Sequence, residues 1–175
     1  AGTELVSAWL IDRGLELDEV SPDGIGHRFV SGNVSIDVLA PDHLGERASL
    51  VTIPPARTVQ VPGGRRALNN SRQFDVRSRD QTGHIPMPTL AGALVAKARA
   101  VAVDDLPEAQ RRDLAFLFSL ASLEISEVLA ELDDRDRQHI GARSEYFDHQ
   151  RPFWDACGEL ADDAKLAFRR IVAHR

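Results

Sequence analysis

The chain lacks several features, each of which would by itself indicate a class of function. Its single cysteine, Cys157, excludes an intramolecular disulfide and a zinc site built from cysteines. No apolar run approaches the roughly 18–20 residues that span a bilayer, and no signal-peptide pattern is present. No serine stands in a Gly-x-Ser-x-Gly frame, and no P-loop glycine pattern occurs. These absences predict a cytoplasmic protein that has no membrane partner.

What the chain does have is enough apolar sequence for a core. Its 175 residues are 43% hydrophobic, which suits one domain or one domain with an appendage. A formal charge of -6 argues against a dedicated nucleic-acid binder, although a local basic patch is compatible with it. The opening stretch, "AGTELVSAWLIDRGL", has helical spacing and ends at a glycine. Because this pattern starts at once and without methionine, we expect further residues before it in the complete protein.

Two halves differ in their sequence period. Residues 1–86 are rich in turn signals and short β-prone runs, such as "HRFV" and "VSIDVLA" on either side of "SGN". Residues 87–175 change to a helical period. We therefore predict an α+β fold in which a small mixed sheet is followed by a helical C-terminal part that packs on it. The boundary between the two domains is expected at 86/87.

Four helices are predicted in the second half. Their ranges are 88–103, 106–122, 123–140 and 162–175. Between the last two, "SEYFDHQRPFWDACGEL" gathers aromatic residues into a predicted packing cluster, in which Cys157 is a small buried hydrophobe. The charged run "DDRDR" at 133–137 is interpreted as a solvated face.

The first candidate for chemistry is Asp37, within "VSIDVLAPD". On an alternating strand, Val34, Ile36 and Val38 share the face expected to point to the core, and Asp37 lies on the opposite face. This carboxylate is either an ordinary solvated strand residue or a group held by a rigid strand toward a metal or a substrate. The alternation alone does not decide between them.

Lys97 and Asp113 are the next candidates. At about 100° per residue, Lys97 falls within the apolar stripe formed by Leu90, Leu94 and Val101. Asp113 falls within the apolar arc of the following helix. An unpaired buried charge is costly, so two interpretations stay open. The two residues form a buried ion pair that fixes how the helices dock, or both line a polar cleft in which Lys97 neutralises a phosphate.

A basic stretch runs from Arg57 to Arg79 in this otherwise acidic chain. Arg65 and Arg66 follow directly on a Pro-Gly-Gly turn, where backbone can approach a ligand closely. Arginine suits bidentate contacts with phosphate, so both are candidate substrate-binding residues. The alternative is an ordinary hairpin that carries arginines on its surface.

Four stretches, taken in order, resemble nucleotidyltransferase-like proteins of the AbiEii toxin type. They are "VSIDVLAPD", "TVQVPGGRRAL", "IPMPTLAGALVAKARAV" and "RRDLAFLFSL", and the resemblance covers roughly residues 3–121. It implies a small mixed sheet of the nucleotidyltransferase kind, followed by helices. In such proteins, two aspartates after a Gly-Ser turn and a third on a neighbouring strand hold divalent metal on a nucleoside triphosphate.

The resemblance assigns roles to residues of this chain. Asp37 matches the third aspartate, a catalytic residue and metal ligand; Lys97 matches the lysine after the sheet; Arg112 and Asp113 match the basic-aspartate step of the next helix. The implied cofactor is Mg²⁺ with a nucleoside triphosphate, and the implied partners are an RNA or protein acceptor and a cognate antitoxin protein. The Gly-Ser turn and the Asp-x-Asp strand do not occur in this sequence. A two-metal site needs several carboxylates, so we expect this chain alone to be inactive.

Three functions agree with these patterns. The first is nucleotide transfer by a larger protein whose upstream residues supply the paired aspartates. The second is a non-catalytic binding or regulatory module derived from the same fold. The third is an RNA-contacting domain that uses the arginine-rich stretch, in which case its binding weakens steeply as salt rises.

Overall fold

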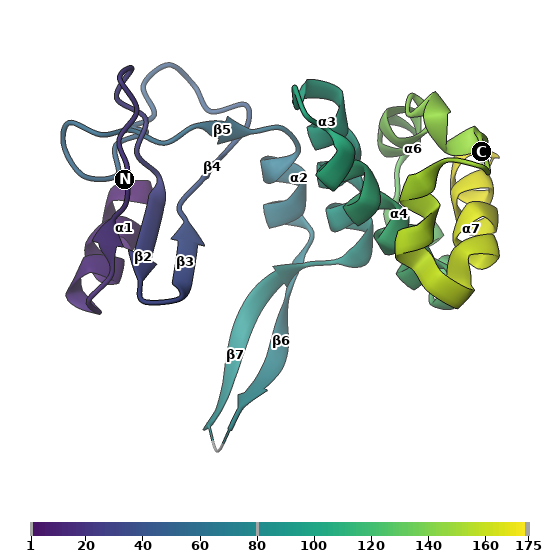
Figure 1. The fold of residues 1–175 in the computed structure, drawn as a ribbon, viewed down its shortest axis with the longest axis horizontal. Coiled ribbons are helices and arrows are strands. Elements are labelled where there is room, and N and C mark those ends of the chain that lie inside the picture. Colours follow the sequence, from purple (N-terminus) through teal and green to yellow (C-terminus); the bar gives the residue numbers. More distant parts are fainter. Residues whose placement is uncertain (1, 80, 174–175) are drawn as a thin grey trace. The chain divides into compact units, whose positions relative to one another are not determined.

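The structure is a computed structural model that describes residues 2–79 and 81–173. It has an α+β fold, as predicted: small N-terminal sheets come first and a helical C-terminal part follows (Figure 1). Contacts divide the chain into two units, Ala1–Gly64 and Arg65–Arg175. The predicted domain boundary at 86/87 stays a prediction. Among the described residues, no helix is both long and apolar enough to cross a membrane.

The first unit begins with helix α1 (Gly2–Asp12), followed by strands β1 (Glu16–Leu17), β2 (Arg28–Ser31) and β3 (Val34–Asp37). These strands form an antiparallel sheet in the order β1-β2-β3. A small core forms where Leu10 of α1 meets Phe29 of β2 and Val38 beyond β3. This sheet positions Asp37, the last residue of β3.

The hairpin between β2 and β3 has the predicted strand–turn–strand form. Gly32 occupies the turn with φ 59°, a conformation that glycine adopts at little cost. The predicted core face of β3 is wrong in part, because Val38 is buried whereas Val34 and Ile36 are 49% and 38% exposed. β3 is an edge strand, and the small core covers only the residues next to Phe29 and Leu10.

Two short strands complete the first unit. β4 (Ala40–Pro41) pairs in parallel with β5 (Gln60–Val61). The buried Asp42 carboxylate accepts a hydrogen bond of 2.9 Å from the Gly63 amide, which holds the glycine turn against β4. A side chain at Gly64 would lie 2.9 Å from the Pro41 Cα, so the close approach of these segments requires glycine there.

In the second unit, helix α2 (Gly64–Asn69) leads into a long hairpin. Its strands are β6 (Ser71–Ser78) and β7 (Gln81–Pro88), which pair antiparallel from Ser71 opposite Pro88 to Ser78 opposite Gln81. The sequence of residues 57–78 predicts a strand, a Pro-Gly-Gly turn, a polar connection and a further strand. β6 is that further strand, α2 replaces the polar connection, and β7 was not predicted. The arginine-rich stretch 57–79 is therefore not a hairpin by itself, because the partner strand of β6 comes later in the chain.

The helical part contains five α-helices within the described residues. They are α3 (Leu90–Val103), α4 (Glu108–Leu123), α5 (Ile125–Glu131), α6 (Asp134–Gly141) and α7 (Ala161–Ala173). Two 3₁₀ segments, Ser144–Phe147 and Pro152–Leu160, lie between α6 and α7. The prediction for the last helix ran to residue 175, and residues 174–175 lie outside the described part.

Caps decide where these helices begin and end. Thr89 caps α3, since its hydroxyl accepts from the Gly92 amide at 3.3 Å. The predicted single helix over 123–140 is wrong, because Asp133 starts a new helix. Its carboxylate accepts from the Asp136 amide at 2.8 Å, and the Asp136 carboxylate accepts from the Asp133 amide in return.

The core of this unit is built on aromatic residues, as the sequence predicted. Tyr146 lies at its centre, with its ring centroid 4.5 Å from that of Phe153 and 5.5 Å from that of Trp154. The Tyr146 hydroxyl donates to the Arg111 carbonyl at 2.9 Å, which satisfies its polar end. Cys157 is buried, as predicted, and its thiol lies 3.2 Å from the Ala115 carbonyl oxygen.

Candidate functional site

Asp37 stands opposite Arg28 on the neighbouring strand. The guanidinium donates to both carboxylate oxygens, with Nε–Oδ1 2.8 Å and Nη2–Oδ2 3.1 Å. This bidentate pair holds the pKa of the Asp37 carboxyl below its usual range, although partial burial opposes the shift. Asp37 is therefore an anion on a rigid strand, with a cation already beside it.

A hollow of about 410 Å³ lies beside this pair in the first unit. Arg28 lines it together with His27, Asp18 and Glu19. The Nδ1 atom of His27 is buried and has no hydrogen-bond partner among the described residues. The hollow thus combines acidic and basic groups next to Asp37.

The residues around Asp37 do not fit a two-metal centre by themselves. Within residues 2–79 and 81–173, no group of three or more His, Cys, Asp or Glu side chains is arranged to hold a metal ion. Mg²⁺ is commonly bound through one or two carboxylates, with phosphates and water completing its octahedral shell. Asp37 can supply one such ligand, since each of its oxygens accepts one hydrogen bond from Arg28 and keeps a second acceptor site, but the guanidinium charge beside it opposes a cation.

In the second unit, Lys97 of α3 and Asp113 of α4 lie together. The lysine ammonium is 2.7 Å from the Asp113 carboxylate and also donates to Gln110 at 2.8 Å. The predicted ion pair is confirmed, but its predicted burial is wrong: the side chains are 35% and 55% exposed. The pair lies at the margin of the α3–α4 contact, where a long lysine side chain extends toward water.

Arg66, a predicted substrate-binding residue, contacts other parts of its own unit. Its guanidinium forms an ion pair with the buried Asp136, donates to the Glu131 carbonyl at 2.9 Å and donates to Asn70 at 3.0 Å. These contacts join α2 to the α5–α6 connection. The predicted solvated face at 133–137 is wrong for Asp136, which is buried and receives Arg66, whereas Asp133 is exposed and caps α6. The neighbouring Arg65 is exposed.

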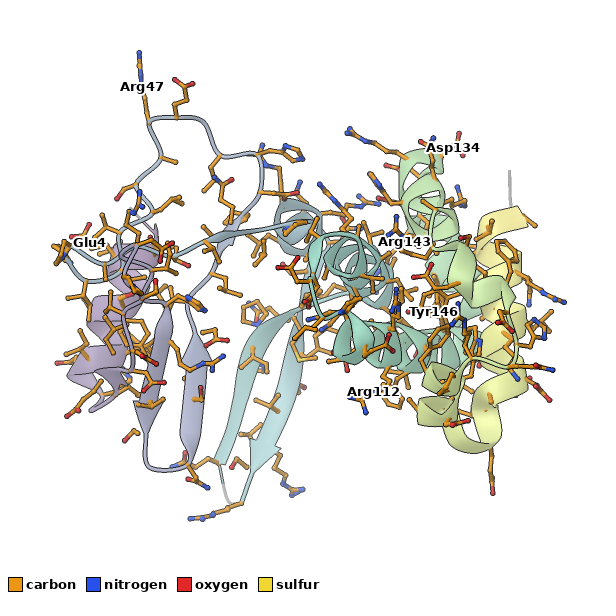
Figure 2. The ribbon with its side chains drawn as sticks, turned by 45° about the horizontal axis from the view of Figure 1, so that its top comes forward. Glu4, Arg47, Arg112, Asp134, Arg143 and Tyr146 are labelled. Carbon is orange, nitrogen blue, oxygen red and sulfur yellow. The ribbon has the colours of Figure 1, made fainter. Side chains whose placement is uncertain are left out.

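Arg112 is exposed on α4 and extends away from the helices, whereas Tyr146 lies among them (Figure 2). It lines a hollow of about 630 Å³ together with Glu108, Asp155 and Phe153. Both of its charged neighbours in this hollow are acidic. The structure brings Lys97 and Asp113 together, but Arg112, although next to Asp113 in the sequence, lines a hollow that neither of them lines.

Asp37 belongs to the first unit, and Lys97 and Asp113 belong to the second. The first unit holds the Arg28–Asp37 pair, and the second unit holds the Lys97–Asp113 pair. The predicted convergence of Asp37 with the two helical residues stays a prediction.

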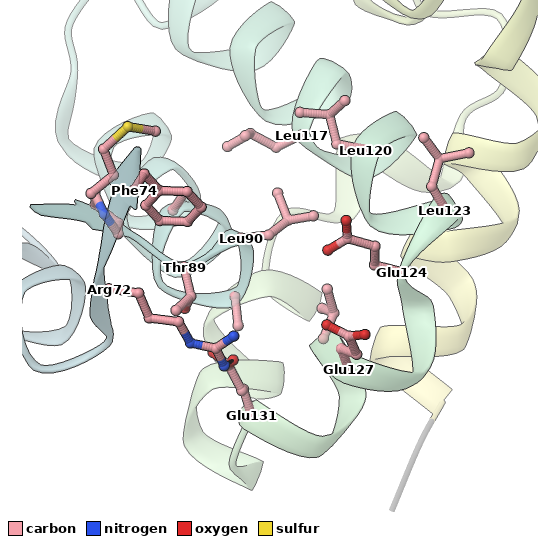
Figure 3. A pocket seen from close by; sticks show the side chains of 15 residues that line it. Arg72, Phe74, Thr89, Leu90, Leu117, Leu120, Leu123, Glu124, Glu127 and Glu131 are labelled. Atoms are coloured by element: carbon pink, nitrogen blue, oxygen red, sulfur yellow. Dashed lines mark hydrogen bonds and ion pairs between the residues drawn. The ribbon is translucent and has the colours of Figure 1, made fainter. Parts of the chain in front are cut away.

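Sequence reasoning missed a third feature, an apolar groove of about 470 Å³ in the second unit. It lies between the hairpin, the C-terminal part of α4, and α5 (Figure 3). Phe74, Leu120 and Leu123 line it, and Glu124 and Glu127 stand at its margin. The sequence held one signal for this groove: apolar residues at helical spacing continue through Leu120 and Leu123, neither of which is among the buried residues of α4.

Comparisons of the chain with models of protein families, with curated proteins and with solved structures found no significant match.

Proposed function

We propose that the chain is the later part of a nucleotidyltransferase-like protein of the AbiEii toxin type. The complete protein would transfer a nucleotide from a nucleoside triphosphate to an RNA or protein acceptor, with Mg²⁺ as cofactor and a cognate antitoxin protein as partner. The order of a small sheet before helices agrees with this proposal. The acidic residue on β3 and the charged residues of α3 and α4 follow in the order that the resemblance implies.

The observation that carries the proposal is the ion pair between Lys97 and Asp113. Two successive helices each present one charged side chain, and the two meet at 2.7 Å. These are the lysine and the aspartate that the resemblance singles out. The lysine side chain is 35% exposed, and a triphosphate would compete with Asp113 and Gln110 for its ammonium.

Asp37 would contribute one carboxylate to the metal site. Its lowered pKa keeps it ionised at neutral pH, which a metal ligand requires. A cation would bind there against the repulsion of the Arg28 guanidinium, through the acceptor sites that the two hydrogen bonds leave free. Further carboxylates would have to come from residues outside this chain, so we expect no transfer by the chain alone.

The test is nucleotide labelling by the complete gene product. We expect incorporation of label from α-³²P nucleoside triphosphates with Mg²⁺ into RNA or protein, and its loss in Asp37→Asn. Asp12→Asn, at an exposed position at the end of α1, is the matched control and should label normally. Labelling by Asp37→Asn at the wild-type rate would contradict the proposal.

The bidentate Arg28–Asp37 pair favours a second candidate, a non-catalytic binding or regulatory module of the same fold. Both carboxylate oxygens accept a hydrogen bond in this pair. If the complete gene product transfers no nucleotide and Asp37→Ala leaves partner binding unchanged, this second candidate replaces the first.

A further inference from the structure

The β6–β7 hairpin has one apolar face. Directly opposed residues of an antiparallel pair share a face, so Phe74 and Ile85 lie together, with Met87 two residues further along β7. These three side chains are 39–42% exposed. A two-stranded hairpin alone is marginally stable in water, so an exposed apolar face on it indicates a surface that gains stability when covered.

The apolar groove continues this face onto the helices. Phe74 and Met87 form one wall of it, and Leu117, Leu120 and Leu123 of α4 form the other. Figure 3 shows Leu90 between the two walls. Leu123 is 68% exposed, which is unusual for so large an apolar side chain beside a formed core.

One margin of the groove is acidic. Glu124 and Glu127 are exposed beside it, and neither side chain has an ion-pair partner among the described residues. Glu131, one helical turn beyond Glu127, is instead paired with Arg72 of the hairpin. Two unpaired carboxylates thus stand next to an apolar floor: Glu124 is the residue between α4 and α5, and Glu127 lies in the first turn of α5.

We propose that this groove docks an amphipathic helix of a partner protein. The apolar side of that helix would cover Phe74, Leu120 and Leu123, and lysines or arginines beside it would meet Glu124 and Glu127. A helix fits because its ridges pack against the leucine ridge of α4. Apolar burial supplies most of the affinity, while the exposed charges set which partner is accepted.

The probe is a labelled model peptide of about 18 residues, long enough to be helical when bound. It has leucines on one face and lysines on the other, and its counterpart has glutamates in place of the lysines. We expect fluorescence anisotropy to give at least tenfold tighter binding of the lysine peptide. Glu124→Gln with Glu127→Gln should weaken that binding about three- to tenfold, because two exposed ion pairs are lost.

Two further variants separate specific docking from general attraction. Asp105→Asn with Glu159→Gln removes the same charge from exposed positions outside the groove lining and should bind as the wild type does. Phe74→Ser with Leu123→Ser should weaken binding at least tenfold, and since Phe74 is 39% and Leu123 68% exposed, the variant should still unfold cooperatively, with a modestly lowered midpoint. If this variant fails to fold, the comparison of the two charge-neutralised double variants still tests the proposal.

Three outcomes would overturn the proposal. The first is equal weakening by the two charge-neutralised pairs, and the second is unchanged peptide binding by the serine variant. The third is a concentration-dependent dimer in sedimentation that the serine variant abolishes, which would assign the groove to a second copy of the chain. None of these measurements uses nucleotide, so failure of the proposed nucleotide transfer leaves them interpretable.

Discussion

The Lys97 ammonium lies 2.7 Å from the Asp113 carboxylate and thereby ties α3 to α4. Gln110 accepts a second hydrogen bond from the same ammonium, at 2.8 Å, so the lysine is held by two residues one helical turn apart. Partial exposure of both partners limits the Coulomb energy, because water screens the charges. The pair therefore contributes more to how the two helices are oriented than to the free energy of folding.

A double-mutant cycle tests this assessment. Lys97→Met and Asp113→Asn, alone and together, should give a coupling of about 0.2–1 kcal/mol in the free energy of unfolding by urea. The Asp162–Lys165 pair within α7, at 3.0 Å and with an exposed aspartate, is the control and should lie in the same range. A coupling above about 3 kcal/mol would indicate a buried pair and contradict the exposure of these side chains.

The sequence predicted the elements that repeat a regular period over many residues. The apolar spacing of α3 and α4 predicted their positions, and the turn residues "SGN" predicted the first hairpin. The charge of a residue did not predict whether its side chain is buried. Asp136 lies in a run of charged residues, yet it is 5% exposed because Arg66, seventy residues earlier in the chain, pairs with it.

The missed elements depend on contacts between segments or on irregular sequence. β7 contains Gly83, Pro86 and Pro88, each unfavourable in a strand, but pairing with β6 overrides these preferences. The break between α5 and α6 was missed because the apolar period continues across it, while the reciprocal cap at Asp133 decides the geometry. The groove likewise exists only once the hairpin and α4 are both in place.

The dependence of folding stability on acid pH should reveal the contribution of the Arg28–Asp37 pair. Since the pKa of Asp37 is lowered in the folded state, the pair stabilises fully above the ordinary aspartate pKa of about 3.9. This stabilisation is lost as pH falls through the lowered folded pKa. Asp37→Asn should thus be less stable than the wild type at pH 7 and should approach it as pH falls through the lowered folded pKa of Asp37.

Chemical unfolding at several pH values measures this difference. The stability of Arg28→Gln should change less at acid pH than that of the wild type, as for Asp37→Asn, because this variant removes the other half of the pair. An equal stability deficit of Asp37→Asn at pH 7 and pH 3 would mean that the carboxylate has no lowered pKa.

Arg66 separates a structural role from substrate binding. Arg66→Ala would leave the buried Asp136 carboxylate without its ion pair, so we expect a loss of about 2–3 kcal/mol in the free energy of unfolding. Arg66→Lys keeps the charge but lacks the fork that reaches three acceptors, and it should lose about half as much. Arg77→Ala, on the exposed hairpin, should change stability by less than about 0.5 kcal/mol. An unchanged urea midpoint for Arg66→Ala would instead mean that these contacts do not stabilise the fold, and it would favour a role of this arginine in binding a ligand.

Cys157 should be nearly inert in the folded protein. Burial raises the pKa of its thiol, and the sulfur lies 3.2 Å from the Ala115 carbonyl oxygen, so little reactive thiolate forms at neutral pH. The colour change with a disulfide reagent at pH 7.5 should be slow in buffer and rapid in denaturing urea, since unfolding exposes the thiol. Tyr146→Ala is the control, because the cavity left by this central side chain should loosen the surrounding core and speed the reaction. Fast reaction of the folded wild type would instead mean that the thiol reaches solvent and that this part of the core opens readily.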